Sequence, residues 1–485
     1  MQTANSELLI PPADVSVELT ALNWDSRLVE PGSLFVAIIG EKVNGNDYIA
    51  EAIGAGAGAV IVSENPSLAV VEIAQEHGVA LLQANDNDAI AALLSLARAW
   101  REQLSGTVIG VTGSSGKTTT KDLIAGVLAG SFNTHATPGN RNSEIGLADT
   151  LLNATQAHDF IVCEMGMQAL GEIDMLCKAA QPHIGVVTNI GVAHCEQLGS
   201  RENIAHAKAE LLENLPDGTG VAILPGDDPF TPSLCSFARL DERKVSTVTY
   251  GLGEQNDIRA THVVYDEMGH PTFDIWTQDG NCYPAQLSLQ GEHNVLNALA
   301  AVAVGIRAGV PIASLMKALG AVKPAALRQE ILETAEGDII LNDTYNANPD
   351  SMRAALSLLK RLAAGKRHVA VLGDMYELGS EEAKYHCQIG EYAFVNGVDE
   401  LVTIGNLGKD IAAGALAVGM PSERVHVCTD VSEALDVLKA LKEPTGDTPA
   451  SDGDSLVILV KASRGMQLEQ VTQGLLAQAA HEVGD

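Results

Sequence analysis

Short runs of consecutive apolar residues alternate along this chain with helical patterns. The apolar runs, rich in Val and Ile, occur at residues 33–39, 59–62, 107–109, 159–164, 184–190, 338–343, 368–374, 400–405 and 456–461. Parallel strands that are covered on both faces have such near-continuous apolar sequences. Ala- and Leu-rich helical patterns lie between many of them, for example at residues 89–103, 121–129 and 201–213. This order predicts an α/β protein built on mainly parallel sheets.

Two interruptions of the pattern divide the chain into three parts. The helical pattern at residues 89–103 ends at Ser105-Gly106, and a second helical pattern stops around Val322-Lys323-Pro324. We therefore expect a small N-terminal α/β domain at residues 1–104, a central parallel-sheet domain at 105–323 and a doubly wound, Rossmann-like domain at 324–485. The length of 485 residues agrees with three domains, since domains average roughly 100–200 residues.

A glycine-rich loop opens the central domain and carries the clearest chemical signal. It reads Gly-Val-Thr-Gly-Ser-Ser-Gly-Lys-Thr-Thr-Thr at residues 110–120, between an apolar strand and a helical pattern. Strand, glycine loop and helix N-terminus together predict a phosphate-binding loop, because backbone N–H groups and the helix dipole then face the anion. Lys117 would reach the terminal phosphates, and the Thr118 hydroxyl would bind Mg²⁺. Val111 replaces the first glycine of the common motif.

Polar residues at strand ends supply the next candidates. Glu164 and Asn189 each end or follow a β-branched run in the central domain, and Asp343 and Asp374 do so in the C-terminal domain. Active groups of parallel sheets lie at the carboxyl ends of the strands. A carboxylate there, close to the phosphate loop, is a plausible Mg²⁺ ligand. For Glu164 considered alone, an acid that simply faces solvent remains an equal alternative.

Five further residues have an ordinary structural alternative. The hydroxyl and guanidinium of Ser26 and Arg27 would suit a diphosphate, although a solvated loop is the commoner case. His194 follows a buried strand, and a lone histidine is more often structural than a ligand. Lys208 lies among alanines and could extend along a packed surface to solvent. Asn294 lies in the first turn of a helix, where an N-cap is the simplest role.

Composition limits the classes of partner. The formal net charge is −32, from 62 acidic and 30 basic residues. Such a surface repels nucleic acid and anionic lipid, so we expect no nucleic-acid partner. Seven scattered cysteines without metal spacing fit a reducing compartment. The N-terminus resembles no signal peptide and the longest apolar run is too short to span a bilayer, so we expect a cytoplasmic protein without membrane insertion. We also expect a monomer.

The order of these motifs closely resembles that of the Mur ligases, the ATP-dependent enzymes of peptidoglycan precursor assembly. The resemblance covers nearly the whole chain. It is carried by residues 25–27, 31–37, 112–119, 137–142, 164–166, 189–200, 207–210, 291–294, 327–328 and 342–352. The last of these runs, with Gly-Asp-Met-Tyr-Glu-Leu-Gly at residues 373–379, resembles the member that adds D-alanyl-D-alanine to UDP-N-acetylmuramoyl-tripeptide.

The resemblance implies a role for each candidate. ATP would be held by Gly113, Ser114, Ser115, Gly116, Lys117, Thr118 and Thr119, with Asn294 on the adenine and with Arg328 and Asp343 reaching ATP from the C-terminal domain. Two Mg²⁺ ions would be held, one by Thr118 and Glu164 and the other near His194, assisted by Lys208 as a carbamate. Ser26 and Arg27 would bind the uridine diphosphate of the substrate, and Asn140 and Arg141 its muramyl-peptide arm. Lys117, Glu164, His194 and Lys208 would be the catalytic residues.

The implied reaction passes through an acyl phosphate that the dipeptide amine then attacks, with the incoming dipeptide bound by the C-terminal domain. Two alternatives stay open at this stage. One is a sister ligase that adds a single amino acid. The other is a nucleotide-binding homologue that has lost catalysis, against which the intact Lys117, Glu164, His194 and Lys208 argue. One departure from the family is Met167-Gln168-Ala169, where an Asn-His pair is common.

Overall fold

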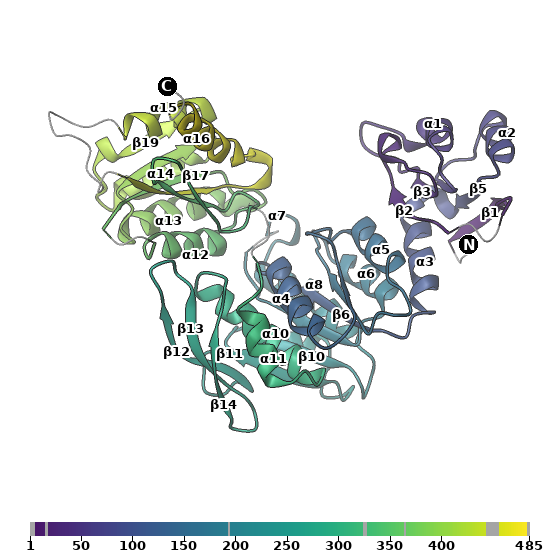
Figure 1. The fold of residues 1–485 in the computed structure, drawn as a ribbon, viewed down its shortest axis with the longest axis horizontal. Helices are drawn as coiled ribbons and strands as arrows, with labels where there is room; N and C mark the ends of the chain where they lie inside the picture. Colours follow the sequence, from purple (N-terminus) through teal and green to yellow (C-terminus); the bar gives the residue numbers. More distant parts are fainter. Residues whose placement is uncertain are drawn as a thin grey trace.

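The strands of the protein form three separate sheets, which follow one another along the chain (Figure 1). The computed structural model describes residues 5–14, 18–192, 195–323, 327–362, 365–442 and 455–482. All three sheets are mixed but mainly parallel, and helices connect their strands. The predicted α/β class with three sheet-based parts is confirmed. Among the described residues, no helix is both long enough and apolar enough to cross a membrane.

The N-terminal sheet has the strand order β1-β5-β4-β3-β2, in which only β1 is antiparallel to its neighbour. Its strands are β1 (Ser6–Ile10), β2 (Ala21–Asn23), β3 (Ser33–Val36), β4 (Ala59–Val62) and β5 (Ala80–Ala84). Its helices are α1 (Ile49–Gly54), α2 (Leu68–His77) and α3 (Ala89–Arg101), with 3₁₀ turns at η1 (Ser26–Leu28), η2 (Gly45–Tyr48) and η3 (Asn85–Asn87). β3 and β4 are buried at every position, as their almost entirely apolar sequences predict.

The central sheet has nine strands in the order β14-β13-β12-β11-β10-β9-β6-β8-β7. Its parallel part comprises β6 (Thr107–Thr112), β7 (Thr134–Ala136), β8 (Phe160–Glu164), β9 (Ile184–Val187), β10 (Val221–Pro225), β11 (Ser246–Gly251) and β12 (Ile258–Tyr265). Two antiparallel strands, β13 (Pro271–Trp276) and β14 (Cys282–Gln286), extend one edge. The phosphate loop therefore leaves β6 between β9 and β8, in the middle of the parallel part.

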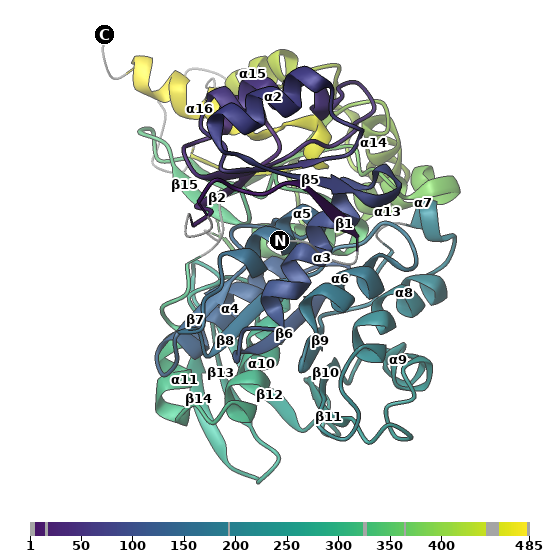
Figure 2. The ribbon, with the colours of Figure 1, turned by 90° about the vertical axis from the view of Figure 1, so that its right-hand side faces the viewer.

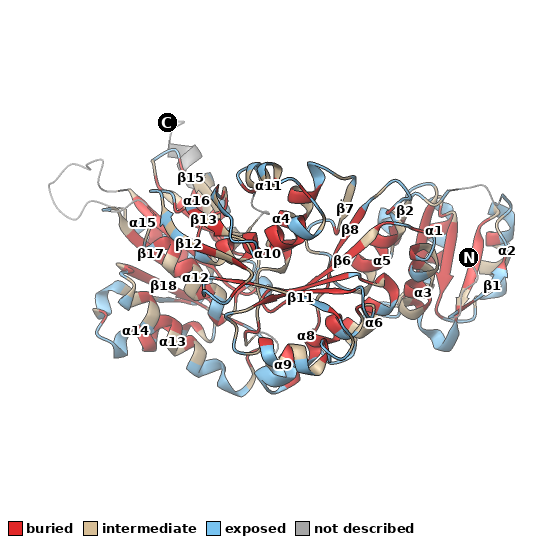
Figure 3. Ribbon diagram, turned by 90° about the horizontal axis from the view of Figure 1, so that it is seen from below, coloured by how far each residue is buried: buried red, intermediate tan, exposed pale blue. Residues whose placement is uncertain are grey.

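Helices cover both faces of this sheet, and Figure 3 shows its strands as a buried layer between more exposed helices. One face packs against α4 (Lys117–Ala129), α10 (Glu292–Arg307) and α11 (Ile312–Leu319). The remaining central helices are α5 (Glu144–Leu152), α6 (Glu172–Ala180), α7 (Cys195–Leu198), α8 (Arg201–Glu213) and α9 (Thr231–Phe237). The helix expected from residue 121 begins four residues earlier, because Gly116 adopts a left-handed conformation (φ 78°) at its N-cap.

The C-terminal sheet has the order β15-β16-β20-β17-β18-β19, with only β15 antiparallel to its neighbour. Its strands are β15 (Glu330–Glu333), β16 (Ile339–Asn342), β17 (Arg367–Gly373), β18 (Glu400–Ile404), β19 (Val425–Cys428) and β20 (Leu456–Lys461). Its helices are α12 (Pro349–Leu359), α13 (Glu382–Val395), α14 (Gly408–Ala417), α15 (Val431–Ala440) and α16 (Glu469–Glu482), with 3₁₀ turns η4 (Gly379–Glu381), η5 (Ser422–Arg424) and η6 (Arg464–Met466). The doubly wound arrangement predicted for this part is confirmed.

The helix α3 joins the N-terminal part to the central one, and Figures 1 and 2 both place it beside α5 and α6. At its end, the buried Arg101 donates from Nε to the carbonyl of Ala180 at 3.0 Å and from Nη1 to the carbonyl of Leu104 at 2.8 Å. Burial lowers the pKa of this guanidinium. Ala180 is the last residue of α6, and Leu104 lies in the segment that follows α3. Arg101 therefore fixes α3 of the N-terminal part to α6 of the central part.

Replacing Arg101 by Met should therefore destabilise this junction. Met keeps the aliphatic volume but leaves two buried carbonyls without a donor, which should cost about 2–4 kcal/mol. The control is Arg98→Ala on the same helix, whose ion pair with Glu102 is half exposed on both sides and is worth less than about 1 kcal/mol. Scanning calorimetry should show a lower melting temperature for R101M than for R98A. Equal melting temperatures would contradict this role for Arg101.

Candidate functional site

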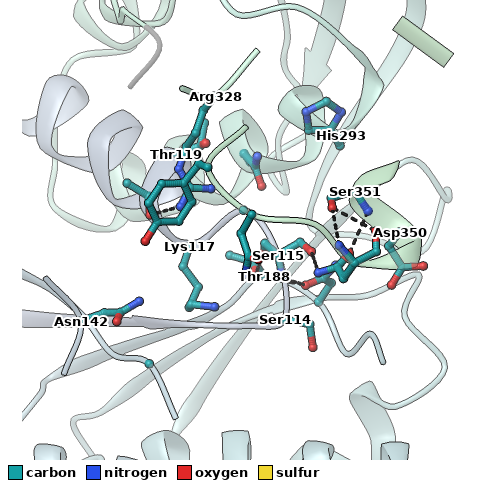
Figure 4. Close-up of a pocket in the computed structure, with 18 of the residues that line it drawn as sticks. Ser114, Ser115, Lys117, Thr119, Asn142, Thr188, His293, Arg328, Asp350 and Ser351 are labelled. Carbon is teal, nitrogen blue, oxygen red and sulfur yellow. Dashed lines mark hydrogen bonds between the residues drawn. The ribbon is translucent and has the colours of Figure 1, made fainter. Parts of the chain in front are cut away.

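A cavity of about 630 Å³ lies between the phosphate loop of the central domain and the carboxyl edge of the C-terminal sheet. Ten of the predicted residues line it: Ser114, Ser115, Gly116, Lys117, Thr118, Thr119, Glu164, Asn294, Arg328 and Asp343. Figure 4 shows Lys117 and Ser115 in the middle of the group, with Asn142 on one side and with Asp350 and Ser351 of α12 on the other. Residues that are far apart in the sequence thus form one site.

The phosphate loop is shaped by two glycines and held by the segment after β9. Gly113 and Gly116 have positive φ angles, and a Cβ on Gly113 would overlap the hydroxyl of Thr188. Asn189 accepts the N–H of Ser114 on its carbonyl and that of Ser115 on its side chain, at 3.1 and 2.9 Å. The predicted strand at 184–190 ends at Val187 because the two residues that follow serve this loop instead of the sheet.

Lys117 occupies the first position of α4 and points back into the loop. Its Nζ donates to the carbonyl of Gly113 at 2.7 Å. Burial lowers the pKa of this ammonium, the Glu164 carboxylate opposes that shift, and Arg328 adds to it. A cation that is held this close to a second cation, Arg328, favours an anionic ligand between them.

Glu164 ends β8 and is only 1% exposed. One carboxylate oxygen, Oε1, accepts from the Thr118 hydroxyl at 3.1 Å and from Asn142 Nδ2 at 2.9 Å. The other, Oε2, is buried without a hydrogen-bond partner among the described residues. An orphaned carboxylate oxygen next to a threonine hydroxyl is the donor set that Mg²⁺ prefers, so these residues fit the expected ion.

The C-terminal domain contacts the phosphate loop directly. Arg328 Nη2 donates to the Thr118 hydroxyl at 3.2 Å, and its guanidinium carbon lies 4.0 Å from the centre of the Tyr345 ring. Asn348, the N-cap of α12, donates from Nδ2 to the Ser115 hydroxyl at 3.0 Å. The two domains are therefore closed on each other at the site where phosphates are expected.

Asp343 follows β16 and forms a buried ion pair with Lys461 at the end of β20, with 2.5 Å between Oδ2 and Nζ. Lys461 also donates to the carbonyl of Asn346 at 2.9 Å. Burial lowers the pKa of Lys461, and the negative charge of Asp343 counteracts this. Asp343 is therefore held in the cavity wall as an oriented carboxylate.

Lys208 lies on α8 and is buried to 1% exposure. No carboxylate of the described residues lies within ion-pair distance of its ammonium. Burial, and then repulsion from Lys117, lowers the pKa of Lys208 well below its ordinary value. The structure thus places Lys208 close to the phosphate loop and away from solvent, which excludes the surface-lysine alternative.

His194 lies outside the described residues, and the described residues contain no cluster of three or more His, Cys, Asp or Glu side chains able to hold a metal.

Four predicted substrate residues do not line this cavity. Ser26 and Arg27 lie in the N-terminal part, where the Arg27 guanidinium binds both oxygens of Asp25 at 2.8 and 2.6 Å. This pairing lowers the pKa of Asp25 to about 2. Asn140 and Arg141 lie on the loop after β7, and Arg141 pairs with Asp149 at 3.0 Å. Both arginines remain largely exposed, so each can still meet an anionic or polar ligand.

Several cavity residues were not among the predicted site residues. They include Asn142, Gln329, Tyr345, Asn348 and Lys461. The rule that identified Glu164 and Asp343 also applies to Lys461, a charged residue at the end of the apolar run 456–461. Asn142 and Asn348 carry no comparable signal, since their role depends on contacts with residues that are distant in the sequence.

The comparisons with known proteins agree with this geometry. Three family models match in order along the chain: the Mur ligase family catalytic domain at residues 18–101, the Mur ligase middle domain at 111–305 and the Mur ligase glutamate ligase domain at 327–464. The UDP-N-acetylmuramoyl-tripeptide–D-alanyl-D-alanine ligase of Bacillus subtilis (strain 168) is 39% identical over 452 residues, which are 93% of this chain and 92% of the relative.

Solved structures give the same picture. A crystal structure of MurF from Acinetobacter baumannii superposes with a TM-score of 0.82 at 31% identity, covering 95% of this chain and 94% of that one. The MurF ligase from Thermotoga maritima in complex with ADP has a TM-score of 0.79 at 27% identity, covering 97% of this chain and 100% of that one. With this similarity along nearly its whole length, the chain belongs to the Mur ligase family.

Proposed function

We propose that this protein is an ATP-dependent ligase that joins D-alanyl-D-alanine to UDP-N-acetylmuramoyl-tripeptide in peptidoglycan precursor synthesis. The names of the relatives that match over nearly the full chain support the substrates. The observation that carries the chemistry is the Thr118 hydroxyl, which contacts Glu164 of the central domain and Arg328 of the C-terminal domain at once. A phosphoryl group at this hydroxyl would meet charged side chains from both domains.

The reaction has two bond-forming steps. A carboxylate oxygen of the tripeptide attacks the γ-phosphorus of ATP, and ADP leaves. The amine of D-alanyl-D-alanine then attacks the acyl carbon, phosphate departs with the former carboxylate oxygen, and the nitrogen loses a proton to leave an amide. Lys117 and Arg328 neutralise the charge that moves between the phosphate oxygens. Closure of the C-terminal domain keeps water from the acyl phosphate.

The three parts of the chain divide the substrates among them, with the muramyl substrate reaching from the N-terminal part to the central one. Residues 1–104 bind the uridine diphosphate through Ser26 and Arg27, and Asn140 and Arg141 hold the muramyl-peptide arm. Residues 105–323 bind ATP, and residues 324–485 bind the dipeptide and close on ATP through Arg328 and Asp343. Arg27 would leave part of its pairing with Asp25 to reach a diphosphate, an exchange of one anionic partner for another.

Mg²⁺ would be held by Thr118 and Glu164, and a second ion by His194 and a carbamylated Lys208. These ions supply charge neutralisation for the transferring phosphoryl group. The protein's own contribution is to orient the ligands: Asn142 donates to Glu164 Oε1, and Oε2 keeps no hydrogen-bond partner among the described residues.

The surroundings of Lys208 favour carbamylation. A buried ammonium without an anionic partner is costly, and its lowered pKa increases the fraction of neutral amine. The neutral amine attacks CO₂, its nitrogen then loses a proton to water, and the carbamate that results is an anion. That anion reverses the repulsion from Lys117 and provides an oxygen ligand.

We further propose that the protein acts as a monomer in the cytoplasm, where its seven free cysteines would stay reduced.

The proposed function predicts phosphate release only with the complete set of substrates. The purified protein with Mg²⁺, ATP, UDP-N-acetylmuramoyl-tripeptide and D-alanyl-D-alanine should release one phosphate per amide formed, as measured by a coupled phosphate assay and mass spectrometry. Activity with a single diamino acid and none with the dipeptide would instead identify a sister ligase. ATP binding without turnover on any muramyl peptide would indicate a homologue that has lost catalysis.

Glu164→Gln should raise the Mg²⁺ requirement. Gln keeps an acceptor for Thr118 and Asn142 but replaces the orphaned oxygen with an amide nitrogen. We expect the Mg²⁺ concentration for half-maximal activity to rise about 10–100-fold, as when other groups around bound metals are altered. Glu172→Gln is the control, since this cavity carboxylate already accepts the Gln168 N–H at 2.6 Å. An unchanged magnesium titration in E164Q would rule out Glu164 as a ligand.

Lys208→Ala should be nearly inactive, with a loss of about 10³-fold or more in kcat, because charge neutralisation at the phosphoryl group is lost. Added formate or acetate should restore part of the activity by occupying the place of the carbamate. Lys178→Ala, at an exposed lysine, should keep full activity. Full activity of K208A, together with an unmodified Lys208 in a high-resolution crystal structure, would refute the carbamate.

A further inference from the structure

A chain of amide hydrogen bonds leads from the phosphate-loop helix to the linker of the C-terminal domain. The Thr120 hydroxyl donates to Asn297 Oδ1 at 3.1 Å, and Asn297 Nδ2 donates to Asn294 Oδ1 at 2.9 Å. Asn294 Nδ2 then donates to the backbone carbonyl of Gln290 at 2.8 Å and to Gln329 Oε1 at 3.3 Å. Both hydrogens of the Asn294 amide are therefore used within the protein.

This chain determines which way the Gln329 amide points. A backbone carbonyl only accepts, so the atom of Asn294 that faces Gln290 must be its nitrogen. The atom of Gln329 that faces that nitrogen must in turn be an oxygen. His293 Nε2 lies 3.1 Å from the same oxygen, so it carries the proton of a neutral imidazole. Burial lowers the pKa of His293, in agreement with a neutral ring.

Because Gln329 Oε1 already accepts from two donors, the Gln329 amino group is the part of the side chain that can bind a ligand. Nε2 forms no hydrogen bond with another described residue, although the side chain lines the cavity and the residue is only 9% exposed. The backbone also fixes this orientation: Gln329 has a left-handed φ of 49°, and its N–H donates to Asp343 Oδ1 at 3.3 Å. A non-glycine residue adopts the left-handed backbone conformation only where the surrounding contacts stabilise it, so these contacts fix the position of Gln329.

The neighbours of Gln329 suit a nucleobase. Leu289 and Leu296 add apolar lining to the part of the cavity wall that comes from α10 and the segment before it. Flat apolar surface with a few directed amides is the usual environment of a base. The phosphate loop, which lines another part of the same cavity, is where the charged end of the nucleotide would bind.

We propose that Gln329 determines base specificity by donating a hydrogen bond to the acceptor nitrogen on the Watson–Crick edge of adenine. This inference rests on the proposed function only in that the ligand is ATP. Adenine presents an unprotonated N1 at that edge, whereas hypoxanthine and guanine present an N1–H. A fixed donor therefore binds ATP and opposes ITP or GTP, because two donors that face each other leave both unsatisfied. Asn294 and His293 are positioning residues for this amide.

Gln329→Glu tests the donor with little other change. Glu has the same shape and keeps an oxygen for Asn294 and His293, but its second oxygen accepts where the amino group donated. By isothermal titration calorimetry with Mg²⁺-nucleotides, the ITP/ATP ratio of Kd values should fall about 10-fold or more relative to the unmodified protein. If the new charge merely repels nucleotides, both Kd values rise together and the ratio stays constant, which would overturn the proposal.

Two further variants complete the test. Gln290→Glu adds the same charge to the same cavity, but the Gln290 side chain faces His270 at 3.2 Å and should leave the ratio unchanged. Gln329→Met removes the donor without adding charge and should also lower the ratio, even if it lowers the melting temperature. Because binding is measured without the muramyl substrates, selective ATP binding without ligation would refute the proposed function alone. Ligation with an unchanged ratio in both Gln329 variants would refute the role of Gln329 alone.

Discussion

The hydroxyl of Thr118 is the point at which the parts of this site meet. It donates to a carboxylate that is almost completely buried, Glu164, and accepts from Arg328, a guanidinium of another domain. A single hydroxyl can satisfy both because it carries one donor and two acceptor positions. The carboxylate, in turn, keeps its orientation through Asn142. If the hydroxyl were absent, the buried charge of Glu164 and the contact between the domains would both lose a partner.

The distribution of charge explains why an anion would complete this arrangement. The chain carries a formal net charge of −32, yet three cations, Lys117, Lys208 and Arg328, lie close enough together to influence one another or a common neighbour. Burial lowers the pKa of both lysines. Repulsion from Arg328 adds to the shift of Lys117, and repulsion from Lys117 adds to that of Lys208. Phosphates and a carbamate would offset this repulsion locally. In an otherwise acidic protein, this concentration of cations is also what would attract a nucleotide to one place.

Sequence patterns predicted the fold and the residues at strand ends, because both depend on local order. Continuous apolar runs predict parallel strands, and the carboxyl edge of those strands then contains Glu164 and Asp343. The same reasoning extends to Lys461 but not to Asn142 or Gln329, whose positions depend on the loop after β7 and on the linker before β15. In the structure both amide hydrogens of Asn294 bind protein oxygens. The contact of Asn294 with adenine, which the resemblance implies, stays a prediction. His194 lies outside the described residues, so its role stays a prediction.

The linker shows how closure and base recognition can depend on each other. Leu327 and Gln329 both have left-handed φ angles, 62° and 49°, on either side of Arg328. Each such residue costs about 1–2 kcal/mol relative to ordinary backbone, so the contacts of the linker must offset the strain. On one side Arg328 reaches the phosphate loop, and on the other Gln329 reaches Asn294 and Asp343.

A nucleotide that bound the phosphate loop and Gln329 together would stabilise both contacts, so its binding energy would favour the closed linker. A nucleotide with the wrong base would bind the loop but leave Gln329 unsatisfied. Base specificity would then appear partly as a weaker tendency of the C-terminal domain to close.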